Sequence, residues 1–223
     1  MAADLRARIM AGDLEPGTRL PSTARLVEEF GVANTTVQKA LGVLKAEGYL
    51  TSRQGKGVFV RDRQPFRVEA GTYFTPEPGG YSYELLEVAE VVPPAEVGKV
   101  FGLDVSEPAQ MRKRLLRHAG RPVEVGWSYY PLSLARGSAL AEPHRIRGGA
   151  PRVLAEAGLP QRYHVDEVSA RMPTTEEADL LSLPNVPVIR QFRVVYSDGD
   201  RPVEASILVK GSHLYELQYR LPV

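Results

Sequence analysis

Apolar residues in the first 60 positions recur at intervals of three and four, which is the spacing of one face of a helix. Three short helices are expected from this pattern, over residues 2–10, 22–30 and 34–47. The third is the most regular, because four apolar residues share one face and leave a polar face opposite. The inward residues are Val37, Ala40, Leu41 and Leu44. The pattern predicts a helix-turn-helix whose second helix presents a polar side.

Two short strands are predicted directly after these helices. Residues 49–53 and 58–61 flank a glycine-containing turn, so they are expected to form a hairpin. Arg53, Lys56 and Arg61 lie around its tip, where cations suit phosphate or minor-groove contact. A helix with a polar leading edge is the part that enters a major groove. We therefore expect a winged helix-turn-helix that binds double-stranded DNA.

The rest of the chain has a different pattern. The first domain, 1–63, is followed by a Pro- and Gly-rich segment, 64–80, which is expected to be a linker. Residues 81–223 alternate strand-like and short helix-like segments, which predicts an α+β domain with helices laid across an antiparallel sheet. Strands are expected over 83–92, 110–118, 122–130, 162–172, 188–196 and 202–210, and helices over 94–101, 151–157 and 174–181.

Polar residues on three of these strands occupy alternate positions, so they share one face of the sheet. They are expected to line a single pocket, with the apolar faces packed below. The residues of this polar face are Arg112, Arg114, Leu116, His118, Glu124, Gly126, Ser128, Tyr130, Glu204, Ser206 and Lys210. Gly149 and Ala150 begin a predicted helix, whose free N–H groups suit an anion; an ordinary helix start is the alternative.

Composition narrows the function classes. The 223 residues are 43% apolar and 25% charged, which is typical of a globular protein. No apolar run is long enough for a membrane span, the N-terminus lacks an export signal, and cysteine is absent, so a cytoplasmic protein is expected. Residues 1–63 hold 10 Lys and Arg against 7 Asp and Glu, and these cations cluster near the hairpin. No cofactor motif, metal-ligand spacing or catalytic constellation is found, so no enzyme is expected.

The order of these features resembles a known family. The segment Leu20–Val60, with its PGTRLPS lead-in and RQGKG turn, is similar to the DNA-binding domain of GntR-family bacterial regulators over residues 1–61. The DNA contacts expected from the residues and this resemblance are Arg25, Asn34, Thr35, Thr36, Gln38, Lys39, Arg53, Gln54, Gly55 and Lys56.

Three positions depart from the family pattern, which usually has arginine where this chain has Ala24, Asn34 and Gln38. Asn and Gln pair best with adenine, so the operator is expected to carry A·T pairs where relatives contact G·C pairs. Two alternatives stay open. Asn34 and Thr35 would act only as helix caps, and Lys39 would belong to a solvated face.

The second domain is similar to the UTRA effector domain of the HutC-type branch of that family, whose fold is similar to chorismate lyase. The matching segments are Arg112-Lys113-Arg114, Gly120-Arg121-Pro122-Val123-Glu124, Ser128-Tyr129-Tyr130-Pro131, Gly148-Gly149, Glu176-Glu177 and Pro202-Val203-Glu204. The effector contacts expected from strand parity and this resemblance are Arg112, Arg114, Glu124, Ser128, Gly149, Ala150, Glu204 and Lys210.

Compared with relatives that bind sugar phosphates, this chain keeps Arg114 and Glu204. It has Leu116 and Gly126 where an arginine and a glutamate are expected, and Lys210 where a tyrosine is expected. A bulkier or less anionic effector is therefore predicted. The alternatives are a structural ion pair for Arg114 and a surface cross-strand pair for Glu204 and Lys210.

Taken together, the sequence predicts a ligand-responsive transcriptional regulator, a repressor, that binds a pseudo-palindromic operator as a homodimer. A small-molecule effector in the second domain would change its affinity for DNA. Two rival functions are kept. One is a small-acid, lyase-like enzyme that uses the second-domain pocket, and the other is a plasmid-maintenance DNA binder without an effector.

Overall fold

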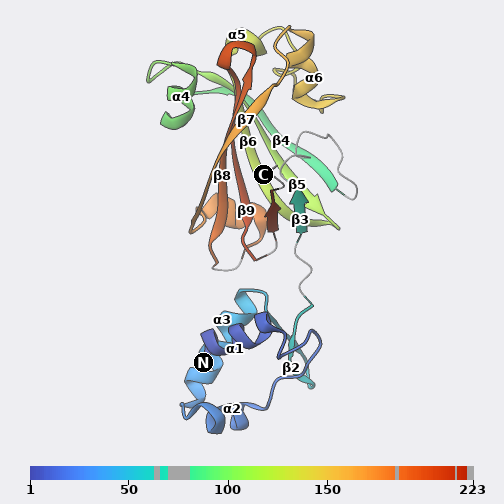
Figure 1. Cartoon of the computed structure of the whole chain (residues 1–223), viewed down its shortest axis with the longest axis vertical. Coiled ribbons are helices and arrows are strands. Elements are labelled where there is room, and N and C mark those ends of the chain that lie inside the picture. Colours follow the sequence, from blue (N-terminus) through green and yellow to red (C-terminus); the bar gives the residue numbers. More distant parts are fainter. Residues whose placement is uncertain (63–65, 70–80, 184–185, 214, 220–223) are drawn as a thin grey trace. The chain divides into compact units, whose positions relative to one another are not determined.

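The computed structural model describes residues 1–62, 66–69, 81–183, 186–213 and 215–219 (Figure 1). The chain divides into two compact units. The first has Met1–Pro65 as its continuous part, and the second consists of Phe66–Leu183 and Pro187–Val223. None of the described helices is long and apolar enough to cross a membrane.

The first unit has the helices and hairpin that the apolar spacing predicts. Its elements are α1 (Ala2–Ala11), α2 (Thr23–Phe30), α3 (Asn34–Ala46), β1 (Leu50–Arg53) and β2 (Gly57–Val60). The two strands pair antiparallel and form, with their turn, a ribbon that we call the wing. Leu26, Val37 and Leu44 are fully buried where the helices meet. Ser22 caps α2 by accepting a hydrogen bond from the backbone N–H of Arg25, and Gly31 ends that helix in a left-handed conformation.

The second unit is built on a six-stranded antiparallel sheet with the strand order β4-β5-β6-β9-β8-β7. This confirms the predicted α+β class. The strands are β4 (Tyr81–Val91), β5 (Ala109–His118), β6 (Arg121–Tyr130), β7 (Tyr163–Arg171), β8 (Val188–Ser197) and β9 (Arg201–Gly211). A short 3-10 turn, η2 (Asp198–Asp200), connects β8 to β9. Each strand therefore carries one set of side chains to each face of the sheet.

Helices cover the two faces of the sheet differently. On one face, α4 (Ala95–Phe101) and α7 (Thr175–Leu181) pack on an apolar surface that includes Met111 and Val125. On the other face, α5 (Leu132–Ala135) and α6 (Gly149–Glu156) pack near one end of the strands, against Tyr130. This second face is left with room above its polar residues.

A small parallel sheet contributes to the same polar face. It consists of β3 (Phe66–Glu69) and β10 (Tyr215–Gln218), which pack Phe66 and Tyr215 against Leu116. Residues 64–80 were predicted as a linker, but the described part of that segment is β3. The sequence did not indicate this pairing, because each strand has only four residues and the partners lie 149 positions apart. The rest of the segment, residues 64–65 and 70–80, lies outside the described residues.

Candidate functional site

The polar face of α3 is exposed along its first two turns. Asn34, Thr35, Thr36, Gln38 and Lys39 are all accessible, because the intervening apolar residues of the helix point into the core. The N-cap position is Ala33, and no side chain caps the helix. The alternative of Asn34 and Thr35 as caps is therefore wrong, and both side chains remain available for other contacts.

Two neighbours of this face lie on α2. Arg25 is exposed, as predicted for a DNA contact. The Gln38 side-chain amide donates a 3.3 Å hydrogen bond to the Thr23 hydroxyl, which joins α2 to α3 at the surface. The predicted interaction of Gln38 with adenine would start from this position.

The wing presents cations at its tip. Arg53, Gln54, Gly55 and Lys56 are all exposed. The Arg53 guanidinium lies 4.5 Å from the centre of the Phe59 ring, so its side chain is positioned along the ribbon.

Arg19, which was not among the predicted DNA contacts, has its guanidinium beside Gly57, next to the turn of the wing. A Cβ added at Gly57 would lie 3.1 Å from its Nε atom. Arg19 belongs to the PGTRLPS segment. A basic residue in this Pro- and Gly-containing segment was the signal that could have predicted the contact.

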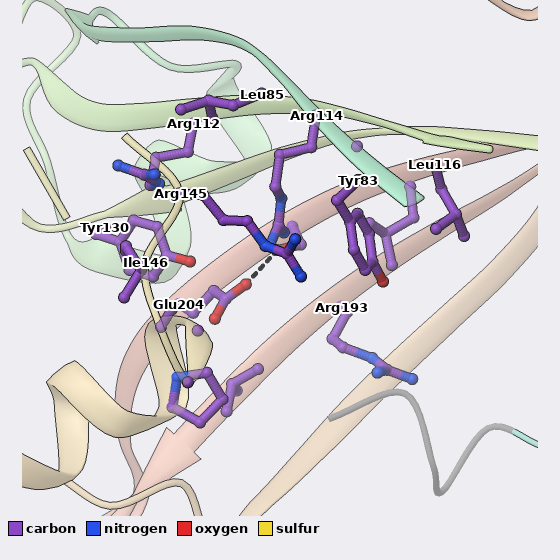
Figure 2. A pocket seen from close by; sticks show the side chains of 18 of the residues that line it. Tyr83, Leu85, Arg112, Arg114, Leu116, Tyr130, Arg145, Ile146, Arg193 and Glu204 are labelled. Carbon is purple, nitrogen blue, oxygen red and sulfur yellow. Dashed lines mark hydrogen bonds between the residues drawn. The ribbon is translucent and has the colours of Figure 1, made fainter. Parts of the chain in front are cut away.

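The second unit contains a cavity of about 710 Å³ (Figure 2). It lies on the sheet face opposite α4 and α7, and its walls come from β4, β5, β6, β8 and β9 together with the loop before α6 and the start of α6. Six predicted effector contacts line it, and they are Arg112, Arg114, Glu124, Gly149, Ala150 and Glu204. The cavity size is within the range of small-molecule sites.

The other two predicted contacts lie beneath the cavity. Ser128 and Lys210 are fully buried and take no part in its lining. The alternative of a surface pair between Glu204 and Lys210 is also wrong, because both side chains are buried and Lys210 forms its ion pair with Glu124 at 3.2 Å. Ser128 and Lys210 therefore support lining residues from below.

Cross-strand register explains the composition of the cavity floor. Arg114 pairs with Gly126, and Gly126 with Leu208. A Cβ at Gly126 would come within 2.9 Å of the Leu208 Cδ2 atom. Gly126, which stands where a glutamate was expected, therefore opens no extra room, because Leu208 lies over the glycine and gives the floor an apolar centre.

Arg112 holds the wall of the cavity in place. Its Nη1 donates to the carbonyl oxygens of Leu140 and Glu142 at 2.9 and 2.8 Å, and its Nη2 donates to that of His144 at 2.6 Å. Burial lowers the pKa of Arg112 from its ordinary value. These contacts fix the segment that leads to α6, so Arg112 shapes the cavity.

A chain of two hydroxyls connects Arg114 to Glu204. The Nη2 atom of Arg114 donates to Ser128 Oγ at 2.7 Å, and Ser206 Oγ donates to Glu204 at 2.8 Å. The two serine oxygens are 2.7 Å apart. Each hydroxyl has one proton, so Ser128 must donate to Ser206 and the chain runs in one direction. We call these two side chains the serine relay.

Tyr130 lies beside the relay. Burial, followed by the charge of Glu204, raises the pKa of Tyr130. Its hydroxyl is therefore protonated at neutral pH and contributes no charge to this end of the cavity.

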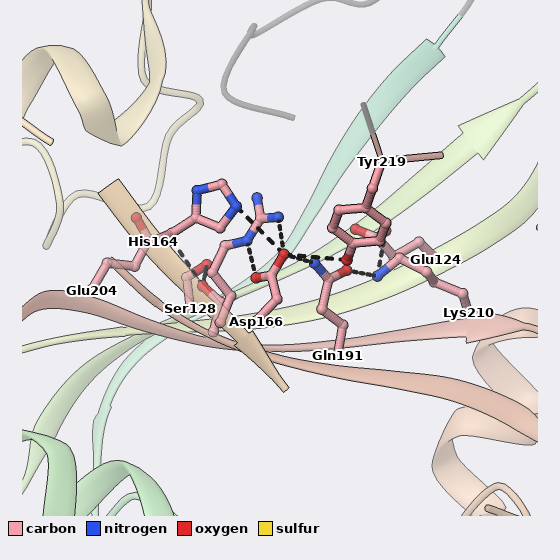
Figure 3. A network of polar contacts seen from close by, with 10 residues as sticks. Glu124, Ser128, His164, Asp166, Gln191, Glu204, Lys210 and Tyr219 are labelled. Atoms are coloured by element: carbon pink, nitrogen blue, oxygen red, sulfur yellow. Dashed lines mark hydrogen bonds and ion pairs between the residues drawn. The ribbon is translucent and has the colours of Figure 1, made fainter. Parts of the chain in front are cut away.

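A second polar network runs from the cavity to the end of the chain (Figure 3). Lys210 Nζ donates to Gln191 Oε1 at 2.7 Å, and Gln191 Nε2 donates to Asp166 at 2.8 Å. The carboxylate of Asp166 also accepts two 2.7 Å bonds from Arg193. Tyr215 of β10 donates to Glu124 at 3.2 Å. The network therefore links the cavity-lining Glu124 and Arg193 to β10.

Burial and charge oppose each other in this network. Burial lowers the pKa of Lys210 even though Glu124 favours its charged form. Burial alone would raise the pKa of Asp166, but the hydrogen bonds and charge of Arg193 hold that pKa below its usual range. Asp166 is thus ionised at neutral pH and balances the buried guanidinium.

Five polar or charged residues of the cavity were not predicted, and they are Tyr83, Arg145, Arg147, Gln161 and Arg193. Strand parity was an available signal for two of them, because Arg193 lies on β8 opposite Ser206 and Tyr83 lies on β4 opposite Leu116. Arg145, Arg147 and Gln161 lie outside the strands, and alternation says nothing about such positions.

Comparison with known proteins supports both units. The family model for bacterial regulatory proteins of the gntR family matches residues 1–60, and the UTRA domain model matches residues 79–215. The chain is 30% identical to an uncharacterized HTH-type transcriptional regulator of Rhizobium meliloti, over 92% of this chain and 87% of that protein. It is 27% identical to the HTH-type transcriptional repressor NagR of Bacillus subtilis, over 86% of this chain and 81% of that protein.

Solved structures match over the whole chain. A crystal structure assigned to the GntR family of transcriptional regulators matches with a TM-score of 0.69 and 30% identity, covering 100% of this chain and 96% of that one. PhnF from Mycobacterium smegmatis matches with a TM-score of 0.61 and 22% identity, over 100% of this chain and 99% of that one, which shows a likeness of fold.

Proposed function

This chain belongs to the GntR family of bacterial transcriptional regulators and carries a UTRA domain, and from that membership we propose that it is a ligand-responsive repressor. It binds a pseudo-palindromic operator as a homodimer in the cytoplasm and releases it when a small molecule fills the cavity. The observation that carries the proposal is the presence, in one chain, of an exposed polar helix with a basic wing and a separate charged cavity. The name of NagR supports repression over activation, because that relative is called a repressor.

The DNA contacts follow from exposure and charge. The first turns of α3 enter the major groove with Asn34, Thr35 and Gln38, while Arg53 and Lys56 of the wing contact the backbone or the minor groove. Arg19 adds a third cation next to the turn of the wing. Thr36, Lys39, Gln54 and Gly55 complete the interface, and Arg25 reaches it from α2.

Base preference follows from the amides on α3. Asn and Gln form bidentate hydrogen bonds with adenine, whereas the arginines common in the family favour guanine. We therefore expect A·T pairs opposite Asn34 and Gln38. The exposure of Asn34 and its freedom from a capping role support this expectation.

The effector binds within the cavity of the second unit. Arg114 and Glu204 are the central contacts, and the backbone N–H groups of Gly149 and Ala150 lie at the same cavity, where a helix start favours an acidic group. Part of the cavity wall is apolar and is formed by Leu85, Leu116 and Leu208. This composition supports an effector that is bulkier or less anionic than a simple sugar phosphate.

The homodimer forms along the edge of the sheet at β7. Val165 and Val168 are 49% and 50% exposed, as is Met172 (49%) just beyond the strand. An edge strand with exposed apolar side chains is a ready surface for pairing with a second copy. Two copies would place two first units on the two half-sites of a pseudo-palindrome.

The direct test uses the full chain and random DNA. Selection of bound sequences should return a pseudo-palindromic site, and anisotropy titrations should show binding that weakens as salt is raised. A metabolite panel added to the complex should contain a compound that releases the DNA. Binding without sequence preference would contradict the proposal, and so would an operator complex that no metabolite weakens.

The rival enzymatic function has no support from the comparisons, since the family consists of transcriptional regulators and not enzymes. The rival function, a DNA binder without an effector, gives no role to the cavity. The cavity has the size of a small-molecule site and is lined by charged residues, which favours an effector.

A further inference from the structure

We propose that the effector is a zwitterion, an organic acid that also carries a cationic nitrogen, with the nitrogen bound by Glu204 and the acid group by Arg114. This inference rests on the proposed function, because it assigns a chemical class to the molecule that fills the cavity. Figure 2 shows the side chains of Arg114 and Glu204 directed into the same part of the cavity.

Glu204 is a buried carboxylate with neutral partners. It is only 9% exposed, yet it lines the cavity. It accepts hydrogen bonds from the Ser206 hydroxyl at 2.8 Å and the Gln161 amide at 3.3 Å. Among the residues that the structure describes, no cation forms an ion pair with it. A carboxylate has about four acceptor sites, so Glu204 has capacity for a donor from the cavity.

A ligand that covers Glu204 must replace the water that solvates it. Covering a carboxylate without a new donor leaves a buried charge with too few hydrogen bonds, which is costly. A second acid group placed there would be repelled as well. A cationic nitrogen satisfies both needs, because it donates hydrogen bonds and balances the charge.

The serine relay sets the distance between the two ligand groups. Three short contacts in series separate the guanidinium of Arg114 from the carboxylate of Glu204. A ligand whose acid and nitrogen are joined by a short link would span the same gap with two contacts and that covalent link. Its acid would accept from Arg114 and its nitrogen would donate to Glu204, parallel to the two serines.

Charge and wall chemistry agree with this assignment. Five arginines and two glutamates line the cavity, so its formal charge is positive and an acid group on the ligand is favoured. The floor beside Arg114 is apolar, because Leu208 lies over Gly126 and Leu85 is the cross-strand neighbour of Arg114. The rest of the zwitterion is thus expected to be an apolar substituent, as in an α-amino acid with a large side chain.

The test uses matched probes on the full chain. Thermal shift and calorimetry would compare the protein amino acids, the same molecules without the amino group (3-phenylpropionate for L-phenylalanine), and the same molecules without the carboxylate (phenethylamine). Glucose 6-phosphate and inorganic phosphate serve as anions without a cationic nitrogen. Glu204→Gln removes the charge, and Glu90→Gln is the control, since Glu90 is an exposed carboxylate of the same unit that does not line the cavity.

At least one amino acid should bind, and removal of its amino group or its carboxylate should weaken binding roughly 10- to 150-fold, as for a hydrogen bond to a charged group. Glu204→Gln should produce a loss of the same order, while Glu90→Gln should bind as the parent does. Tightest binding by glucose 6-phosphate or by an acid without nitrogen overturns the inference but leaves the proposed function standing. Absence of binding by every zwitterion also overturns it, and an operator complex that no metabolite releases overturns the proposed function itself.

Discussion

Basic side chains are built into the two units in opposite ways. In the first unit, Arg25, Lys39 and Lys56 are exposed on the helix and the wing. In the second, Arg193 and Lys210 are buried. The Asp166 carboxylate accepts from Arg193, and Lys210 contacts the Glu124 carboxylate and the Gln191 amide oxygen. Exposed cations are available to a polyanion and contribute little to folding, whereas buried cations must be satisfied within the fold. The difference supports the proposal that the exposed cations of the first unit contact DNA, whereas Arg193 and Lys210 maintain the cavity.

The largest effect is expected where a buried charge loses its partner. Asp166→Ala leaves Arg193 buried without its carboxylate, so the second unit should lose about 3–5 kcal/mol of unfolding free energy. Chemical denaturation followed by tryptophan fluorescence checks this, because the chain has one tryptophan, Trp127, on β6 of that unit. Asp198→Ala, which removes an exposed partner of Arg162, is the control and should change little. Equal losses of unfolding free energy in the two variants would contradict the difference between buried and exposed cations.

Acid should weaken the second unit. Arg193 holds the pKa of Asp166 below its ordinary 3.8, and Arg171 and Thr174 hold that of Glu177 below its ordinary 4.5, although burial opposes both shifts. A depressed pKa gives stability that is present above the ordinary value and is lost as pH falls toward the folded value. Trp127 fluorescence during acid titration should therefore change below about pH 4.5. In Asp166→Ala the loss should be shallower, and an unchanged profile would contradict the role of this ion pair.

A smaller effect is expected from α3, the helix proposed to contact bases. Asn34→Ala should reduce the preference for A·T at the contacted position by about 1–3 kcal/mol, the value of one good bidentate pair. Asn34→Arg, which introduces the residue common in the family, should move the preference to G·C. Competition binding with operators changed at single positions measures both. Guanine selected by the parent protein would show that Asn34 does not set the preference.

The smallest effect is expected at the wing. Lys56→Ala should weaken binding to all DNA sequences alike and reduce the slope of log affinity against log salt by about 1, as for one lost phosphate contact. Stability should be unchanged, since Lys56 is exposed. Lys99→Ala, an exposed cation on α4, is the matched control and should keep the parent slope. A loss of sequence preference in Lys56→Ala would mean that the wing contacts bases.

The sequence predicted the parts of the sites that follow from periodicity. Helical spacing placed Val37 and Leu44 inward and Asn34 outward, and strand alternation placed Arg114 and Glu204 on one face. Alternation tells which face of the sheet a side chain lies on, but not whether that side chain reaches the cavity or lies buried below its floor. Ser128 and Lys210 were therefore expected to contact the effector, although they lie below the cavity floor.

Features that depend on distant pairing could not be predicted. Arg145 reaches the cavity from a segment without periodicity, and β3 meets β10 through strands of four residues. The position of Leu208 over Gly126 also depends on the register between β6 and β9, which one-strand patterns do not specify. These features come from tertiary packing and not from local preference.

The central claim is that a ligand of the cavity controls binding of DNA by the first unit. It is tested most directly by anisotropy of labelled operator bound to the full chain, titrated with the compound that most raises the melting temperature. The account predicts that operator affinity falls about 5- to 150-fold, that Glu204→Gln abolishes the response, and that Glu90→Gln retains it. A compound that occupies the cavity and leaves operator affinity unchanged would contradict the claim.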